Sequence, residues 1–185
     1  MSKTKLKKRR IPYSLLIIAL GITLVAIPFV WKVNQTDLSF NKSPEVAVQA
    51  TETIKGQKPQ SLRITKINID LVIEEGKVNN GKWEVSKDGA SHFASSAFPG
   101  GGGNIVIYGH NKKKIFGSLE FLKPGDEISI VTVDNAEHKY KISKIQTVSP
   151  DQIEVLNPTT HEMLTIYTCT GLFDTKRLVV KANPV

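Results

Sequence analysis

The sequence predicts an all-β fold, specifically a closed or nearly closed antiparallel barrel. From residue 61 to the end, short runs of alternating apolar residues, rich in β-branched side chains, recur along the chain, which is the pattern of half-buried strands. Clusters of Gly, Pro, Asn and Asp separate these runs, whereas helical periodicity is weak. Many short strands at such spacing are typical of a barrel, and roughly 125 residues suffice for one barrel core.

Seven runs carry the strand pattern, and residues 71–73 extend or follow the first of them. The predicted strands are 62–69, 82–85, 104–108, 127–133, 138–148, 163–169 and 177–182. Two segments, 115–122 and 89–97, have the pattern of one or two helical turns. The sequence contains no internal repeat, so it predicts a single barrel.

The positions of the charges argue against nucleic-acid binding, although the formal net charge is +8 at pH 7. Six of the 25 basic residues lie in the first ten positions, and Lys32 is a seventh. Residues 33–185 then hold 18 basic and 17 acidic residues. A surface that follows a phosphate backbone needs clustered positive charge, and we interpret the one dense run, 112–114, as a solvated loop. We therefore expect no nucleic-acid partner.

Residues 11–31 contain no charged side chain and predict a transmembrane helix that acts as a signal anchor. At about 1.5 Å per residue the run spans roughly 30 Å, the thickness of the hydrocarbon core of a lipid bilayer. Tyr13 and Trp31 lie at its two ends, as interfacial aromatic residues do, and the basic residues 1–10 predict a cytoplasmic tail. A cleaved signal peptide is the alternative, but its apolar region would be shorter. The rest of the chain is then expected outside the cell, at the cell membrane.

The polar residues 32–60 show no sustained period and predict an extracellular stalk, followed by a folded domain at 61–185. The predicted strand 163–169 of that domain ends on Cys169, the only cysteine, which therefore forms no internal disulfide. A thiol at a strand end, two residues before Gly171, is placed to do chemistry. A lone cysteine is, however, more often a small buried apolar residue, and this run alone leaves both interpretations open.

Two further stretches place polar side chains at strand ends. The apolar run 104–108 is followed by Gly109 and His110, and histidine both accepts and donates protons near neutral pH. Arg177 opens the last predicted strand. Taken singly, a histidine is usually structural and an arginine is usually a surface charge. We interpret the other three histidines in that ordinary way: His92, His138 and His161.

Together, these motifs resemble the sortase family, the membrane-anchored cysteine transpeptidases of Gram-positive and related bacterial surfaces. The motifs are Thr165-x-x-Thr168-Cys169, Gly109-His110 at a strand end, and Arg177 opening the last strand. Landmarks outside the site agree with them: Pro99-Gly100 ahead of Gly103-Asn104, Phe116 with Leu119, and Gly125-Asp126. The family motif usually reads Thr-Leu-x-Thr-Cys, and Ile166 stands here for leucine, which conserves volume and apolarity. The similarity covers roughly residues 61–185.

The resemblance implies a closed eight-stranded barrel, with one or two short helices, and an active site in a groove on its outer wall. It implies that Cys169 is the nucleophile that forms a thioester, that His110 is the general acid and base, and that Arg177 stabilises the oxyanion or holds the substrate backbone. Thr168, through its hydroxyl, or a backbone N–H near Thr170 would complete the oxyanion site. The connection 149–161 would form one wall of the groove. Its candidate substrate contacts, for which simple core packing is an equal explanation, are Ile153, Val155 and Leu156.

The resemblance also implies the partners. The substrates would be secreted proteins with a C-terminal sorting signal resembling Leu-Pro-x-Thr-Gly, cleaved after the threonine. The acyl group would pass to an amine of a peptidoglycan precursor or of a pilin lysine. The sequence shows no aromatic lid motif and ends directly after its last predicted strand, so we expect an anchoring sortase of class A or class D/E. We expect no cofactor and no required metal, because Glu154 and Glu162 have the pattern of solvated acids.

Two other functions fit parts of the sequence. A membrane-tethered barrel that binds a cell-surface peptide or glycan without catalysis would need no reactive thiol. The cysteine transpeptidases that cross-link peptidoglycan directly need a histidine just before the cysteine, where this chain has Thr168 and Tyr167. We rank this last function lowest.

Overall fold

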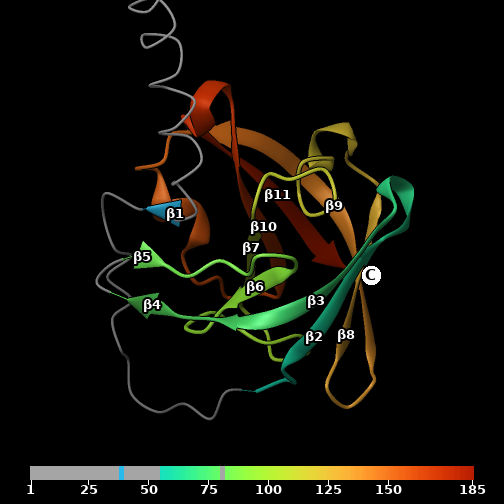
Figure 1. Ribbon diagram of the computed structural model, residues 1–185. Coiled ribbons are helices and arrows are strands. Elements are labelled where there is room, and N and C mark those ends of the chain that lie inside the picture. The colour runs from blue at the N-terminus through green and yellow to red at the C-terminus, as the bar shows by residue number, and fades with distance from the viewer. Residues whose placement is uncertain (1–37, 40–54, 80–81) are drawn as a thin grey trace, which may run out of the picture. The chain divides into compact units, whose positions relative to one another are not determined.

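The computed structural model describes residues 38–39, 55–79 and 82–185 (Figure 1). The predicted cytoplasmic tail 1–10, the predicted anchor 11–31 and most of the predicted stalk 32–60 lie outside these residues. Across the described ranges, no helix has both the length and the apolar character needed to cross a membrane.

A closed barrel of eight strands forms the folded domain, in the order β10-β11-β9-β8-β2-β3-β6-β7, which confirms the predicted fold class. The strands of the barrel are β2 (Pro59–Ile64), β3 (Ile69–Gly76), β6 (Ala90–Phe93), β7 (Asn104–Gly109), β8 (Glu127–Thr132), β9 (Glu137–Val148), β10 (Met163–Thr170) and β11 (Lys176–Pro184). Three further strands make a small separate sheet in the order β1-β5-β4. They are β1 (Leu38–Ser39), β4 (Val78–Asn79) and β5 (Lys82–Trp83).

The barrel is not wholly antiparallel, and in this respect the prediction was wrong. β3 pairs with β6 and β7 pairs with β10 in parallel, while the remaining neighbours are antiparallel. A parallel pair needs a long crossover connection. Residues 77–89 supply it between β3 and β6, and the β8–β9 hairpin lies between β7 and β10 in the chain. Alternation of apolar residues indicates a strand but carries no information about its direction.

Local structure also departs from the predictions at two places. The predicted strand 62–69 is interrupted by η1 (Thr65–Ile67), where Asn68 adopts a left-handed φ of 53°. The predicted helical turn at 89–97 is wrong, because residues 90–93 form β6. All four residues of β6 are buried, including Ser91 and His92, so the run lacks the polar alternation that would have revealed a strand. The predicted turn at 115–122 is present in part as η2 (Leu119–Phe121).

The buried apolar residues of the domain form two separate clusters. The inner cluster fills the barrel with alternate side chains such as Ile105 and Ile107 of β7 and Ile166 of β10, as expected for strands whose successive side chains point to opposite faces. The outer cluster lies against the outside of the same strands. It consists of Trp83, Phe93, Val106, Tyr108, Leu156, Tyr167 and Val179. The outer wall over β7, β10 and β11 is therefore a second apolar surface.

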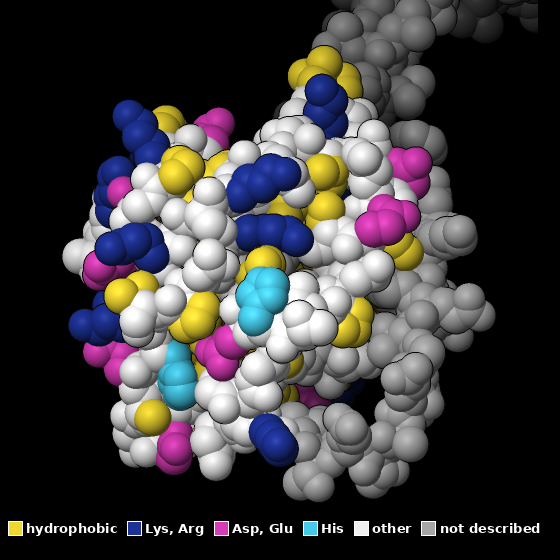
Figure 2. All heavy atoms as spheres, turned by 180° about the vertical axis from the view of Figure 1, so that it is seen from behind, with side chains coloured by type: hydrophobic (Ala, Val, Ile, Leu, Met, Phe, Trp, Pro, Cys, Tyr) yellow, Lys and Arg dark blue, Asp and Glu magenta, His cyan; other side chains and the backbone are white. Residues whose placement is uncertain are grey.

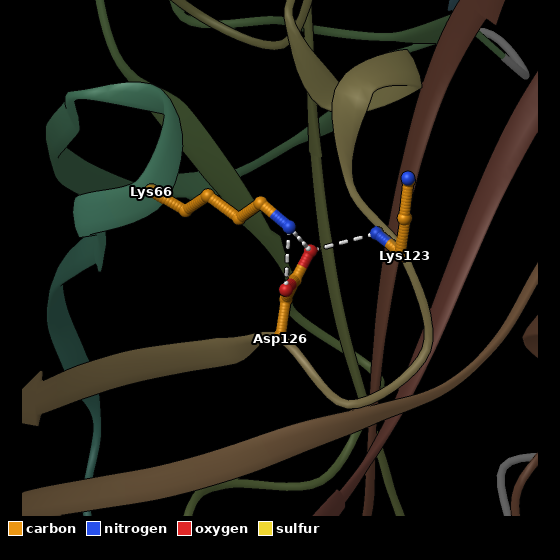
Figure 3. A network of polar contacts seen from close by, with 3 residues as sticks. All are labelled: Lys66, Lys123 and Asp126. Atoms are coloured by element: carbon orange, nitrogen blue, oxygen red, sulfur yellow. Dashed lines mark hydrogen bonds and ion pairs between the residues drawn. The ribbon is translucent and has the colours of Figure 1, made fainter.

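Asp126 connects the start of β8 to η1 on the neighbouring part of the barrel (Figure 3). Both of its carboxylate oxygens accept from Lys66 Nζ at 2.8 Å, and Oδ2 also accepts from the Lys123 N–H at 2.7 Å. The hydrogen bond from Lys66, followed by the one from Lys123, lowers the pKa of Asp126. The Gly125-Asp126 landmark of the sequence thus has a structural role in closing the barrel.

Candidate active site

The register of three adjacent strands brings Cys169, His110 and Arg177 to one end of the outer wall. Cys169 of β10 is the direct cross-strand partner of Arg177 of β11. On the other side, Thr168 is the parallel partner of Gly109, so Cys169 and His110 are the next residues along two strands that run side by side. Figure 1 shows β7, β10 and β11 as neighbours.

These residues face the outside of the barrel. Tyr108 and Tyr167, each two residues before His110 and Cys169, both belong to the outer cluster, and residues two apart on a strand share a face. Cys169 itself packs against that cluster and is half-buried, as is His110. The structure therefore gathers the three predicted catalytic residues, which lie as far as 67 positions apart in the chain, at one place on the outer wall.

Gly109 allows the loop after β7 to pack closely beside the site. A Cβ added at Gly109 would lie 2.9 Å from two ring carbons of Phe116 and 3.2 Å from Ile115. Phe116 is almost fully buried in the inner cluster, so it has little room to move away. A glycine before His110 is thus a packing requirement of the loop that follows the histidine.

Thr168 does not face the groove, and this corrects its predicted role as an oxyanion donor. Its side chain is fully buried, and Oγ1 donates a hydrogen bond to the carbonyl of Gly109 at 2.8 Å. Because Thr168 precedes Cys169, its side chain points to the opposite face of β10. The hydroxyl instead joins β10 to the end of β7, directly behind the cysteine and histidine. Thr170 is half-exposed at the end of β10, and its backbone role stays a prediction.

Arg177 is held by the turn that connects β10 to β11. Its side chain is only 6% exposed, and Nη1 donates to the carbonyls of Asp174 at 2.7 Å and Lys176 at 3.0 Å. Its Nε is buried and has no hydrogen-bond partner among the residues that the structure describes. A buried donor without a partner is costly, and the two carbonyl contacts of Nη1 hold the guanidinium in place beside Cys169.

The turn itself has an unusual backbone. Phe173 and Asp174, both in η4 (Leu172–Asp174), adopt left-handed φ values of 55° and 59°, a region that is uncommon for a bulky side chain. This geometry aims the Asp174 carbonyl at Arg177 and leaves Leu172 and Phe173 exposed. Nothing in the sequence except Gly171, which has a φ of 79°, indicated this turn.

Burial raises the pKa of the Cys169 thiol above its ordinary value of 9.0, and the Asp174 carboxylate adds to the increase. The charge of Arg177 acts in the opposite direction but does not cancel the effect of burial. Burial and the Asp174 carboxylate therefore favour the neutral thiol over the thiolate.

Tyr167 is a residue of the site that the sequence did not suggest. It is fully buried in the outer cluster between the strands that carry His110 and Arg177. Burial raises its pKa to about 12, while the charge of Arg177 acts in the opposite direction. At neutral pH a neutral phenol therefore lies close to the Arg177 guanidinium. A tyrosine within a run of strand-forming residues is usually an ordinary core residue. The sequence therefore gave no indication that Tyr167 lies near Arg177.

The three residues predicted to form a groove wall lie in one short helix and differ in burial. η3 (Ile153–Leu156) packs on the outer cluster. Leu156 is 5% exposed and belongs to that cluster, whereas Ile153 and Val155 are half-buried. Leu156 therefore packs as core, and Ile153 and Val155 keep the exposure that a substrate contact requires.

Two other classes of site find no support in the described part of the chain. No group of three or more His, Cys, Asp or Glu side chains there is arranged to hold a metal ion. On the face shown in Figure 2, basic side chains are interspersed with acidic and apolar ones, unlike the continuous basic surface of a nucleic-acid binder.

Comparison with known proteins identifies the family. A family model for the sortase domain matches residues 62–185. Sortase D of Bacillus subtilis (strain 168) is 32% identical over 123 residues, which cover 66% of this chain and 56% of that protein. Sortase A of Bacillus anthracis is 34% identical over 89 residues, 46% of this chain and 42% of that protein.

Among solved structures, a sortase D5 transpeptidase of Clostridium perfringens is 32% identical and has a TM-score of 0.59, covering 70% of this chain and 79% of that one. In the curated relatives, the matching part is only 42% to 65% of their length. The fold and the site define a closed β-barrel protein with a half-buried thiol on its outer wall, beside a histidine and an arginine. With a family model that matches most of its length, the chain belongs to the sortase family.

Proposed function

We propose that this protein is a cysteine transpeptidase that cleaves a sorting signal through a thioester on Cys169. The observation that supports it most directly is the register that places Cys169 between His110 and Arg177 on the outer wall. The named relatives include sortases A and D, which is consistent with an anchoring enzyme of class A or class D/E.

In the first step, the Cys169 thiol attacks the carbonyl carbon of the scissile peptide. As the sulfur attacks, the proton of the thiol passes to the His110 imidazole. The guanidinium of Arg177, the cross-strand partner of Cys169, donates to the oxygen on which negative charge develops. The carbon–nitrogen bond then breaks, the imidazolium returns the proton to the departing amine, and an acyl thioester remains.

In the second step, an acceptor amine attacks the thioester carbonyl. A nitrogen–carbon bond forms, the carbon–sulfur bond breaks, and His110 accepts the proton that the nitrogen loses. Water can replace the amine and hydrolyse the thioester, so access of the acceptor decides between transfer and proteolysis.

The substrate groove and the cellular setting belong to the same proposal. An extended Leu-Pro-x-Thr-Gly peptide fits an apolar groove whose wall offers Ile153 and Val155. The donors are secreted proteins with such a C-terminal signal, and the acceptor is an amine of a peptidoglycan precursor or a pilin. Residues 11–31 anchor the protein in the cell membrane, with residues 1–10 in the cytoplasm and the stalk and barrel outside.

The test is turnover of a fluorogenic Leu-Pro-x-Thr-Gly peptide panel by the full chain in detergent, with and without an amine. We expect a covalent thioester and a transfer product that Cys169→Ala and His110→Ala abolish and Arg177→Lys impairs. The matched control is His138→Ala, which removes a histidine of β9 outside the site and outside the connection 149–161. Peptide binding without any thioester, by a chain whose Cys169 still reacts with thiol reagents, would instead support the non-catalytic binding function.

A further inference from the structure

Two buried polar residues lie on the outer face of the strands that carry the cysteine and the histidine. Asn104 begins β7 and Thr165 is the third residue of β10, and their exposed fractions are 3% and 0%. By alternation they share this face with residues of the outer cluster such as Val106 and Tyr167. A polar side chain buried beside an apolar cluster is costly unless it is hydrogen-bonded, so the partners of these two residues indicate their role.

Asn104 connects β10 to the end of η3 through its side-chain amide. Its Oδ1 accepts from Thr165 Oγ1 at 2.7 Å, and its Nδ2 donates to the carbonyl of Asn157 at 3.0 Å. Since a carbonyl only accepts, the amide nitrogen must face Asn157 and the amide oxygen must face Thr165. Asn104 is 53 positions from Asn157 and 61 from Thr165 in the chain, so local sequence patterns do not indicate these contacts.

The two ends of η3 are held differently. Before its first residue, the Gln152 N–H donates to the carbonyl of Ser149, and the Ser149 N–H donates to Gln152 Oε1, so these hydrogen bonds lie within the connection itself. After its last residue, the Asn157 N–H donates to the carbonyl of Glu154, while the Asn157 carbonyl accepts from Asn104. The bond from Asn104 therefore ties the end of η3 to the barrel.

Asn104 is too far from Cys169 to touch a reacting group. In the parallel pair of β7 and β10, Met163 is registered with Asn104, and Thr168, which precedes Cys169, is registered with Gly109. These two registered pairs are five residues apart, so Asn104 lies about 16 Å along the strands from the catalytic end. It can act on the reaction only through another element.

That element is η3, which lies against the same apolar surface as the cysteine. Ile153 and Val155 are half-buried and pack against the outer cluster, as Cys169 does. Three residues of extended peptide span about 10 Å, so a substrate with its scissile carbonyl at Cys169 carries the side chain three positions earlier along this surface. In a Leu-Pro-x-Thr-Gly signal that side chain is the leucine.

We propose that Asn104 is a positioning residue that sets the selectivity of the groove for the first side chain of the sorting signal. This inference rests on the proposed transpeptidase function. The amide of Asn104 holds the end of η3 against the barrel, and the Thr165 hydroxyl fixes the orientation of that amide. Ile153 and Val155 then present an apolar contact to the leucine that is formed before the substrate arrives. Without the hydrogen bond to Asn157, η3 shifts and the discrimination falls, although the thiol, imidazole and guanidinium keep their places.

The experiment compares two fluorogenic peptides, Leu-Pro-x-Thr-Gly and Ala-Pro-x-Thr-Gly, as substrates of the full chain in detergent. The ratio of their kcat/KM values measures the discrimination between the two side chains, and it does not depend on the concentration of active enzyme. The variants are Asn104→Ala, which removes both hydrogen bonds, and Thr165→Val, which keeps the shape of the side chain but removes the donor to the amide. Thr165→Ser retains the hydroxyl and should keep the wild-type selectivity.

Thr132→Val is the matched control for the loss of a buried threonine hydroxyl. Thr132 is fully buried, and its Oγ1 donates to the carbonyl of Ala136 at 3.0 Å in the β8–β9 hairpin. This hairpin lies at the opposite end of β9 from the connection 149–161. The control should therefore lose stability in urea denaturation but keep the wild-type selectivity. An equal fall of selectivity in the control would mean a general loosening of the barrel and would overturn the role of Asn104.

For Asn104→Ala, we expect the selectivity for leucine over alanine to fall roughly three- to tenfold, the effect of one lost hydrogen bond. The fall should come from a higher KM for the leucine peptide, with kcat changed by less than about twofold. Thr165→Val should show a smaller fall in the same direction, and it decides the question if Asn104→Ala does not fold.

Two results would count against the inference in different ways. Unchanged selectivity in both variants, or a lower kcat for both peptides at the same selectivity, would overturn the positioning role alone. Failure of the wild-type chain to form any thioester would overturn the transpeptidase function and this inference together.

Discussion

The sulfur of Cys169 is subject to opposing influences that single substitutions can separate. Burial and the Asp174 carboxylate raise its pKa, and the Arg177 charge lowers it. Asp174 reaches the arginine through its carbonyl and acts on the cysteine through its charge. The backbone contact and the electrostatic effect can therefore be tested apart.

Asp174→Asn should lower the pKa of Cys169, because it removes a nearby negative charge while asparagine tolerates the left-handed backbone at this position. Arg177→Gln should raise that pKa further. The measurement is the rate of alkylation of the thiol as a function of pH, since only the thiolate reacts. We expect the midpoint to move to lower pH in the first variant and to higher pH in the second. Identical profiles in all three proteins would contradict the assigned electrostatics.

At the scale of elements, the parallel pair β7–β10 determines whether a site exists. It places the ends of two strands, widely separated in the chain, next to each other. Thr168 and Gly109 form the last registered pair before Cys169 and His110, and a side-chain hydrogen bond strengthens it.

Thr168→Val keeps the shape of the side chain and removes this hydrogen bond, so we expect a loss of about 1 kcal/mol in the free energy of unfolding. Thr168→Ser retains the hydroxyl and is the matched control for the bond, although it also removes a buried methyl group. Urea denaturation followed by circular dichroism measures both. If valine proves no more destabilising than serine, the bond from Thr168 to Gly109 does not contribute as inferred.

Gly109→Ala should destabilise the domain by about 1 to 3 kcal/mol, because the new methyl group would overlap the buried Phe116 ring. Phe116→Leu makes room at that place, so the double variant should be less destabilised than the sum of the two single variants. Additive losses in the same urea experiment would show that Phe116 is not what restricts position 109.

The sequence predicted the positions of several strands but not their directions or the turn at Phe173, and the reasons are physical. The strand at 127–133 was found because alternate residues are buried and the sequence pattern shows it. The strand at 163–169 is buried on both faces from Leu164 to Thr168 and was found from its β-branched residues. The direction of β10 relative to β7 was not, because period-two alternation is the same for both directions. The three site residues were found from ordered motifs, but Tyr167 and the left-handed turn at Phe173 became visible only from tertiary contacts.

For the whole molecule, barrel closure includes an ion pair between segments 60 positions apart, Lys66 and Asp126. The pKa of Asp126 is lower in the folded than in the unfolded chain, so the unfolded chain binds more protons as the solution becomes acidic. The stabilisation is therefore complete above the unfolded pKa and is lost as the pH falls through the folded one.

Asp126→Asn should lower the thermal midpoint of the protein at about pH 7, and the difference from the wild type should shrink as the pH is brought below about 4. Scanning calorimetry at several pH values measures this. Asp70→Asn, which alters an exposed pair with Arg63, is the matched control and should have a smaller effect. If the difference between the two thermal midpoints stays constant with pH, then Asp126 does not stabilise the fold through its negative charge.

Successive side chains of β10 point to opposite faces of the barrel wall. The number of residues removed or added before Cys169 therefore decides whether its sulfur points outward or inward. Removing a single residue within 163–168 would turn the sulfur from the outer wall into the barrel interior, whereas removing two would restore its face but displace it by one repeat. Engineered insertions are therefore best placed in the exposed tip of the β8–β9 hairpin at Asp134 and Asn135, where an added tag leaves the registration of β10 untouched.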